Sequence, residues 1–234
     1  MQPKKISNQI TKNLKQYCKK HNITKAVLGL SGGIDSAVCA ALVVMALESK
    51  NVTALLMPEK GITKKQNVRD AVQVCRQLKI NYIIQSINPF LITYANNIRF
   101  PLSNLAKINL KARIRVAILY SYANTNNAIV IGTGNKTELT LGYFTKYGDG
   151  AVDILPIGNL YKQQVREIAA ILKIPNQIII KKPTAELYRN QSDEDELGMS
   201  YEEFDHRLQT NKLTKQIRQI IKKNAHKTKQ IPIM

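Results

Sequence analysis

Apolar residues along the chain alternate between two kinds of pattern. Short, largely apolar runs predict a buried strand at residues 26–30 and further strands at residues 52–57, 81–87 and 128–132. Between these runs, apolar residues recur at the spacing of one helix face, which predicts helices over residues 6–20, 35–48, 67–78, 105–123 and 161–172. A segment rich in glycine and polar residues follows the fourth strand, and a further strand-like run occupies residues 152–157.

Strands that alternate with helices indicate βαβ units, whose strands run parallel and whose crossovers are right-handed. The predicted fold class is therefore α/β, with a doubly wound (Rossmann-like) parallel sheet flanked by helices. Residues 1–234 are long enough for one buried core, and neither a repeat nor a low-complexity linker divides them. We expect a single domain.

The composition is typical of globular proteins, with 44% hydrophobic and 22% charged residues. No apolar stretch approaches the length of a membrane span, and the first residues lack the apolar core of a signal peptide. We therefore expect a cytoplasmic protein with no membrane partner. The cysteines, Cys18, Cys39 and Cys75, are odd in number and widely spaced, so buried free thiols are favoured over a disulfide framework or a zinc site.

The formal net charge is +19, and such a field attracts polyanions, whether nucleic acid, a nucleotide or a phosphorylated substrate. Part of the excess lies in residues 212–229, where basic residues recur without an acidic one. A solvated helix face followed by the end of the chain explains that run better than a nucleic-acid arm does. We therefore expect no nucleic-acid partner.

The most informative short segment is Ser31-Gly32-Gly33, between the first strand and a helix that begins near Asp35. Paired glycines let backbone N–H groups converge on one point, and the helix aims the positive end of its dipole at the same place. The segment therefore predicts a phosphate cradle. Asp35 is placed to bind Mg²⁺ carried by the phosphates, with the hydroxyls of Ser31 and Ser36 nearby.

Other motifs explain this segment less well. A Walker loop needs a Lys-Ser/Thr pair after its last glycine, and the Gly-x-Gly-x-x-Gly fingerprint is absent. Residues 29–33 fit the Gly-x-Ser-x-Gly pattern of a nucleophile elbow, but the histidines, His21, His206 and His226, offer no clear catalytic triad. Helix capping by Asp35 alone leaves the paired glycines unexplained.

The sequence SGGIDS resembles the loop of the ATP-pyrophosphatase (adenine nucleotide α-hydrolase-like) superfamily, and residues 132–162 and 182–205 resemble ammonia-dependent NAD synthetases. The resemblance implies the fold of that superfamily and a ligase that converts deamido-NAD (nicotinic acid adenine dinucleotide) to NAD. In that reaction ATP adenylates the substrate, ammonia attacks the NAD-adenylate, and AMP and pyrophosphate are released. It also implies Mg²⁺, ATP as co-substrate and a homodimer.

The resemblance also assigns site residues. The implied catalytic residues are Asp35, Glu138, Lys162 and Asp149, of which Asp35 and Glu138 bind the metal. The implied ATP contacts are Gly29, Leu30, Ser31, Gly32, Gly33, Ile34, Asp35, Ser36, Thr133, Lys162 and Thr184. The implied deamido-NAD contacts are Arg113, Lys146, Asp153, His226 and Lys227, and Asn109 joins them because it shares a helix face with Arg113.

Further expectations concern the second half of the chain. Residues 191–196 are predicted to order over the reacting groups and exclude water, and Ser200 with Glu203 forms a predicted capping box. No glutaminase domain is evident, so free ammonia or a separate supplier must serve. Helix 105–123 carries apolar residues on more than one side, which suits either a partner subunit or burial within its own subunit.

Two alternatives remain at this stage. A tRNA-modifying member of the superfamily, of the thiolation or lysidine type, fits the basic charge, although thiolation usually needs paired reactive cysteines and Cys39 and Cys75 lack suitable spacing. A non-enzymatic ATP-binding module fits the loop, but it gives no use to Glu138, Lys162 and Asp149 as a set.

Overall fold

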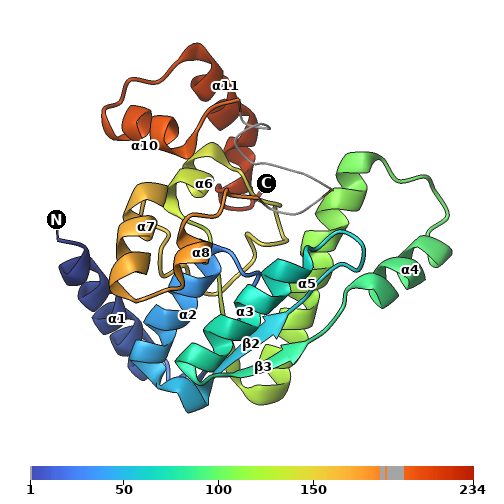
Figure 1. Ribbon diagram of the computed structural model, residues 1–234. Coiled ribbons are helices and arrows are strands. Elements are labelled where there is room, and N and C mark those ends of the chain that lie inside the picture. The colour runs from blue at the N-terminus through green and yellow to red at the C-terminus, as the bar shows by residue number, and fades with distance from the viewer. Residues whose placement is uncertain (1, 185–187, 189–197) are drawn as a thin grey trace.

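The centre of the protein is a parallel sheet of four strands in the order β3-β2-β1-β4 (Figure 1). The computed structural model describes residues 2–184, 188 and 198–234. The strands are β1 (Lys25–Gly29), β2 (Val52–Leu56), β3 (Asn81–Ile84) and β4 (Ala128–Ile131). Parallel pairing throughout confirms the predicted α/β class, because parallel neighbours require crossover connections.

Helices cover both faces of this sheet. They are α1 (Pro3–Lys20), α2 (Ile34–Leu47), α3 (Lys65–Leu78), α4 (Asn88–Asn97), α5 (Asn104–Asn126), α6 (Lys136–Leu141), α7 (Lys162–Ile171), α8 (Asn176–Ile179), α10 (Tyr201–Gln209) and α11 (Lys215–Asn224), with 3₁₀ turns η1 (Ser49–Asn51) and η2 (Ala225–Lys227). Helices α1, α2, α3 and α7 pack on one face, whereas α4 and α5 pack on the other.

Alternate residues of each strand point to opposite helical layers. In β1, Ala26 and Leu28 join the core under α2, while Val27 joins the smaller core under α5. All three are at most 1% exposed. Burial on both faces explains why β1, β2 and β4 read as nearly continuous apolar runs, whereas all four residues of the edge strand β3 are exposed.

Several sequence predictions need correction. Residues 152–157 do not form a strand, since only one bridge, between Ile131 and Ile154, pairs them with the sheet. Strand β3 ends at Ile84 rather than at residue 87. Helix α4 follows it and was not predicted, because it has no buried residue and therefore no apolar stripe in the sequence. Helix α6 lies inside the segment expected to be irregular, and α8 was not predicted, whereas α11 falls within residues 212–229, which were interpreted as a solvated helix face.

The strand order places a switch point between β1 and β4. From β1 the chain continues to β2 on one side, and β4 is added on the other side, so the connections leaving β1 and β4 diverge. In open α/β sheets the crevice at the carboxyl ends of such strands is where ligands bind. The glycine segment follows β1 and residues 132–135 follow β4, so both border this crevice.

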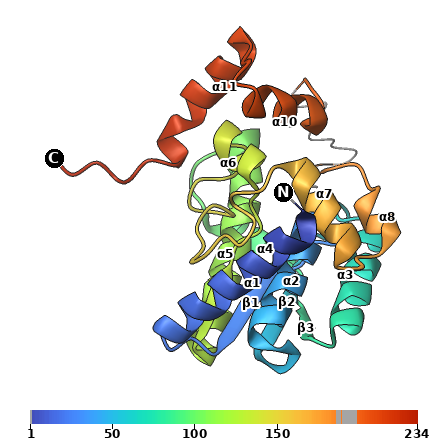
Figure 2. The same cartoon turned by 90° about the vertical axis from the view of Figure 1, so that its left-hand side faces the viewer.

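The C-terminal helices pack on α6 beside the crevice (Figure 2). Leu141, Phe204 and Ile217 form a small buried core of their own. Gly142 ends α6 with φ +66°, and a side chain there would press against Asn224, whose amide donates to the Leu141 carbonyl at 2.9 Å. Among the described residues, no helix combines the length and apolar character that a membrane crossing needs.

Candidate active site

The glycine segment forms a tight turn into the amino terminus of α2. Gly32 has φ +80°, and an added Cβ would lie 2.2 Å from the carbonyl oxygen of Asn67, so only glycine fits. The Gly33 N–H donates to the Ser31 hydroxyl at 3.2 Å, and the Ser31 N–H donates to the Ser36 hydroxyl at 3.3 Å. Backbone donors and hydroxyls are thus gathered at a helix amino terminus, where an anion is stabilised.

Asp35 lies in the first turn of α2 and meets residues that follow β4. Its Oδ2 is 2.5 Å from the Lys162 ammonium, and its Oδ1 accepts from the Asn135 side-chain amide at 3.0 Å. Both contacts cross the switch point. The carboxylate predicted from the first half of the chain therefore faces the lysine predicted from the second half.

Glu138 is held by the capping box of α6. Asn135 accepts from the Glu138 N–H at 3.0 Å, and the Asn135 N–H donates back to the Glu138 carboxylate at 3.2 Å. The other carboxylate oxygen lies 3.6 Å from the Lys162 ammonium. Asn135, which is fully buried, thus orients Asp35 and Glu138 together. The Asn-x-x-Glu spacing was a readable signal for Asn135, but sequence reasoning missed it.

Lys162 begins α7 in a nearly closed environment. It is 3% exposed, and its ammonium lies 4.9 Å from the centre of the Tyr201 ring. Its backbone N–H donates to the Thr137 hydroxyl at 3.3 Å. Only a cation with strong partners is tolerated at such a position, and the two carboxylates and the ring supply them.

Asp205 in α10 joins the helices that carry the site. It accepts a hydrogen bond from the Thr137 hydroxyl and another from the Gln163 N–H at 2.9 Å. Burial raises the pKa of the Asp205 carboxyl, and these two donors, with the Lys162 and Arg166 charges, oppose that rise. Of the predicted capping box, the structure shows the half in which Ser200 accepts from the Glu203 N–H at 3.2 Å, while the Glu203 carboxylate pairs with Arg207. No spacing in the sequence indicated the role of Asp205.

The carboxylates fit the proposed magnesium site. Asp35 and Glu138 flank one cationic group, so a second positive centre nearby would also be stabilised. The described residues contain no group of three or more His, Cys, Asp or Glu that would hold a metal without other ligands. One or two carboxylates completed by substrate phosphates and water is the donor set that Mg²⁺ prefers.

A second group of predicted residues gathers on the loop after α6. Asn109 accepts from the Thr145 hydroxyl at 2.9 Å, and Arg113 donates to the Lys146 carbonyl at 3.3 Å, so the shared helix face meets one loop. Asp149 accepts from the Thr145 N–H at 2.9 Å. The residue retains exposed surface, but desolvation of its carboxyl raises the pKa of Asp149, opposed by the Thr145 N–H and the Lys227 charge.

Lys227 reaches the same loop from η2. Its ammonium donates to the Gly142 carbonyl at 2.7 Å and to the Phe144 carbonyl at 2.8 Å. Burial lowers the pKa of Lys227, while Asp149 raises it. Lys227 therefore shapes the loop that carries Lys146 and Asp149, whereas His226 is exposed.

The remaining predicted residues lie around this centre. Asp153 accepts from the Tyr120 hydroxyl and from the Val130 N–H, both at 2.8 Å, on the α5 side of β4. Desolvation, followed by the Asp153 contact, raises the pKa of Tyr120 to about 12. Thr133 and Thr184 are half-buried, and residues 191–196 lie outside the described part of the chain.

Comparison with known proteins gives consistent matches. A family model described as NAD synthase matches residues 6–233. The NH(3)-dependent NAD(+) synthetase of Archaeoglobus fulgidus is 42% identical over 98% of this chain and 96% of that protein. A solved NMN synthetase from Francisella tularensis is 37% identical with a TM-score of 0.93, covering 100% of this chain and 99% of that one. The NH3-dependent NAD synthetase of Campylobacter jejuni is 36% identical with a TM-score of 0.81 and the same coverage.

Proposed function

The chain belongs to the NAD synthase family, and we propose that it is a ligase that uses ATP and ammonia to convert deamido-NAD to NAD, the last step of NAD biosynthesis. The observation that carries the proposal is the meeting of Asp35, Glu138 and Lys162 at the mouth of the glycine turn. Two carboxylates and one buried ammonium beside a phosphate cradle suit an enzyme that uses ATP to activate a substrate better than a module that only binds ATP.

The reaction requires two displacements. An oxygen of the nicotinate carboxylate attacks the α-phosphorus of ATP, and pyrophosphate leaves. Ammonia then attacks the acyl carbon of the adenylate, loses a proton and releases AMP. Because the first step brings one anion onto another, alignment and charge neutralisation account for most of the barrier reduction.

The residues divide these tasks. Amides and hydroxyls of residues 29–36 hold the triphosphate, and Lys162 supplies a positive charge where negative charge develops on the transferred phosphate. Asp35 and Glu138 would hold Mg²⁺, which would supply positive charge to the phosphate oxygens. Thr133 and Thr184 complete the ATP contacts. Asp149 remains a candidate for holding the nicotinate end or the ammonia.

For deamido-NAD, we propose the surface formed by α5 and the loop after α6. Asn109, Arg113 and Lys146 lie together there, with Asp153 and His226 as further contacts. Lys227 is assigned an indirect part, since its ammonium is engaged with loop carbonyls.

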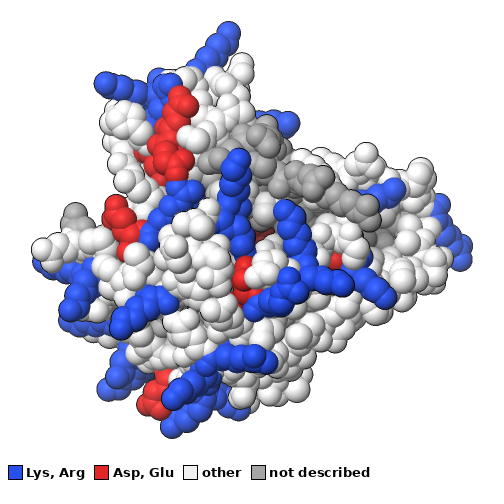
Figure 3. Space-filling model, in the orientation of Figure 1, with Lys and Arg blue, Asp and Glu red and all other residues white. Residues whose placement is uncertain are grey.

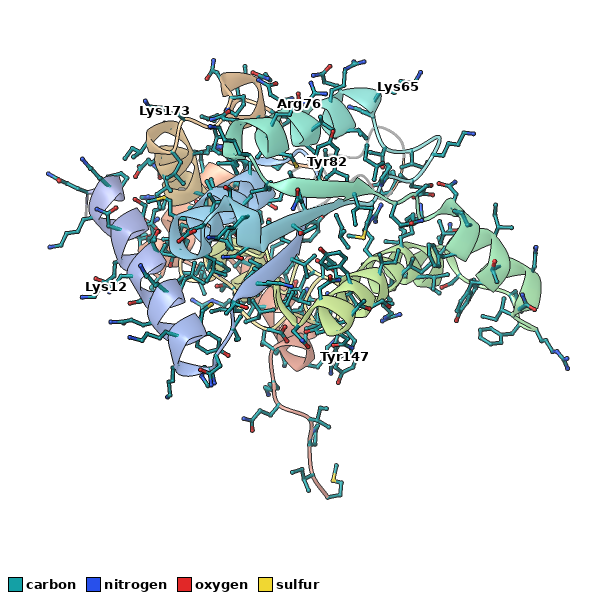
Figure 4. The ribbon with its side chains drawn as sticks, turned by 90° about the horizontal axis from the view of Figure 1, so that it is seen from below. Lys12, Lys65, Arg76, Tyr82, Tyr147 and Lys173 are labelled. Carbon is teal, nitrogen blue, oxygen red and sulfur yellow. The ribbon has the colours of Figure 1, made fainter. Side chains whose placement is uncertain are left out.

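We also propose that the protein is a homodimer. Strand β3 is an open edge, and large apolar side chains are exposed along it and along α4, which stands out from the body (Figure 4). They include Tyr82, Ile83, Ile84, Phe90, Ile92 and Tyr94. Helix α5 packs Ile114, Ile118, Tyr120 and Tyr122 in part against its own core, whereas Leu105 near its start is 67% exposed and open to a partner. We place the enzyme in the cytoplasm, where ATP is available and thiols stay reduced.

A second substrate follows from one observation. The Francisella tularensis protein that matches with a TM-score of 0.93 is an NMN synthetase. Nicotinic acid mononucleotide carries the same nicotinate carboxylate as deamido-NAD, so the same activation and amidation would convert it to NMN. The mononucleotide lacks the adenosine monophosphate half of deamido-NAD, which makes the two substrates separable by assay.

The test is to incubate purified protein with Mg-ATP, ammonium and either deamido-NAD or nicotinic acid mononucleotide. NAD or NMN should appear together with equal amounts of AMP and pyrophosphate, and the ratio of kcat/KM values identifies the preferred substrate. A tRNA sample serves as the rival substrate. On the face visible in Figure 3, Lys and Arg are scattered rather than gathered in one stripe. This distribution does not favour tRNA as the substrate. AMP release that depends on tRNA alone would contradict the proposal.

A further inference from the structure

Lys181, which follows α8, contacts the phosphate cradle directly. Its ammonium donates to the Gly32 carbonyl at 2.9 Å, to the Asn67 side-chain oxygen at 2.8 Å and to Asp70 Oδ2 at 2.5 Å. Asn67 and Asp70 belong to α3, so one side chain joins the turn after β1 to the helix after β2. Neither the sequence patterns nor the implied site residues included Lys181.

The Gly32 carbonyl is a sensitive point of the turn. In a trans peptide the C=O and the following N–H point in opposite directions. A lysine that holds the Gly32 carbonyl on one side therefore fixes the Gly33 N–H on the other, where it now meets the Ser31 hydroxyl at 3.2 Å. With φ +80°, Gly32 has the backbone freedom to rotate if this contact is lost.

The partners of Lys181 are themselves well held. Asp70 is 1% exposed, and its second oxygen accepts from the Gln66 side-chain amide at 2.7 Å. The side chain of Lys181 is 24% exposed, so its anchor is more deeply buried than the lysine. The backbone oxygen of Asn67 also blocks any Cβ at Gly32. Helix α3 thus supports the turn through both steric and charged contacts.

We propose that Lys181 is a positioning residue for the triphosphate: it holds the Gly32–Gly33 peptide so that the turn is already shaped for ATP. The inference rests on the proposed binding of ATP at this turn. A lysine ammonium has three donors, and the Gly32, Asn67 and Asp70 oxygens match them. Direct contact with a phosphate would require Lys181 to give up at least one of these bonds.

The experiment measures the Kd of Mg-ATP by calorimetry, together with kcat and KM, for the wild type, Lys181→Met and Asp70→Asn. Lys182→Met is the matched control, because Lys182 is exposed and adjacent and its loss changes the charge by the same amount. We expect Lys181→Met to weaken ATP binding by about 10-fold or more. The KM for the nicotinate substrate should change by less than about twofold, because the surface proposed for that substrate is formed by α5 and the loop after α6 and not by the turn.

Asp70→Asn separates positioning from direct contact. Removing an acidic charge near a triphosphate strengthens its binding if Lys181 is thereby freed to reach a phosphate. If Lys181 acts through the turn, the same substitution weakens the anchor of Lys181, the turn is held less firmly, and ATP binding weakens. This variant also tests the proposal if Lys181→Met fails to fold.

The outcomes are distinguishable. Weaker ATP binding in Lys181→Met and Asp70→Asn, with Lys182→Met near the wild type, supports the inference. Wild-type affinity in Lys181→Met, equal losses in Lys182→Met, or tighter binding in Asp70→Asn overturns it. A wild-type protein that binds no ATP contradicts the proposed function instead.

Discussion

The Asp35 carboxylate and the Lys162 ammonium lie 2.5 Å apart, although 127 residues separate them in the chain. The lysine side chain is 4% exposed and that of the aspartate 17%. A buried pair of this kind is costly unless further contacts compensate for desolvation. Here Asn135, Glu138 and the Tyr201 ring supply them, so the centre is arranged for charge handling rather than for stability.

The two carboxylates should be essential for turnover. Asp35→Asn and Glu138→Gln each remove one negative charge from the proposed metal site, and each should lower kcat at least ~100-fold, the scale of one transition-state charge contact. The assay is AMP release under saturating Mg-ATP. Glu48→Gln is the control, because that side chain is 75% exposed and pairs with the equally exposed Lys50. Near-normal turnover in both site variants would refute the metal assignment.

Gly32→Ala should abolish ATP binding. The added Cβ would lie 2.2 Å from the Asn67 oxygen, so the turn must move. Gly61→Ala is a matched control, since Gly61 also has a positive φ, +89°, but no atom lies within 4 Å of the added Cβ. Both substitutions carry about 1–2 kcal/mol of backbone strain. Thermal unfolding should therefore show a cost in both, whereas calorimetry should show lost ATP affinity only in Gly32→Ala.

Asp205→Asn should impair catalysis although Asp205 is not a proposed substrate contact. The amide oxygen of the variant can still accept from the Gln163 N–H, but the amide NH2 then faces Thr137, whose hydroxyl must change from donor to acceptor, so the charge-assisted bonds to the carboxylate are lost at a cost of about 1–3 kcal/mol. Since these contacts join α6 to α7, kcat should fall more than the KM for ATP rises. Glu203→Gln in the same helix is the control, because its exposed pair with Arg207 is worth only about 0.3–0.5 kcal/mol. Equal kinetics for the two variants would count against this role.

The same residue should leave a mark on the pH dependence of stability. Burial raises the pKa of Asp205 above its ordinary value of 3.8, so the native state holds this proton more tightly than the unfolded state. The contribution of protonated Asp205 to the free energy of unfolding is fully present below pH 3.8 and is lost as pH rises through the pKa of Asp205 in the native state. Urea unfolding of the wild type and Asp205→Asn across this range should show the wild type losing stability relative to the variant. A pH-independent difference would contradict the raised pKa.

A charged residue on the open edge should disrupt the proposed dimer. Ile84 and Phe90 are 52% and 44% exposed on β3 and α4, and glutamate at either position would have to be desolvated in an apolar interface. Light scattering after gel filtration should give the dimer mass for the wild type and the monomer mass for Ile84→Glu and Phe90→Glu. Met45→Glu, 48% exposed on α2, serves as the control. A monomeric wild type would end the proposal.

Local features of the chain were readable without tertiary structure. Apolar runs and helical spacing predicted the order of the main strands and helices, because period and burial decide how a backbone satisfies its hydrogen bonds. The glycine turn was predicted as well, and the structure places it between β1 and α2. The shared face of Asn109 and Arg113 also held, since four-residue spacing on a helix is purely local. The cysteines Cys18, Cys39 and Cys75 are free and buried, as predicted.

Other features depended on packing. Helix α4 buries no residue, so it has no apolar stripe to read, and residues 152–157 failed as a strand because they pair with the sheet at a single bridge. The places of Asp205 and Lys181 were likewise invisible, because each acts on elements far away in the chain.

The sequence by itself therefore determined the α/β class, the glycine turn before α2 and the types of charged group available. Only the tertiary structure decided which charges meet: Asp35 with Lys162, Lys181 with the Gly32 carbonyl, and Lys227 with the loop after α6. The physical reason is that propensity and periodicity act over a few residues. Ion pairs and buried hydrogen bonds depend instead on which surfaces the folded chain brings together and removes from water.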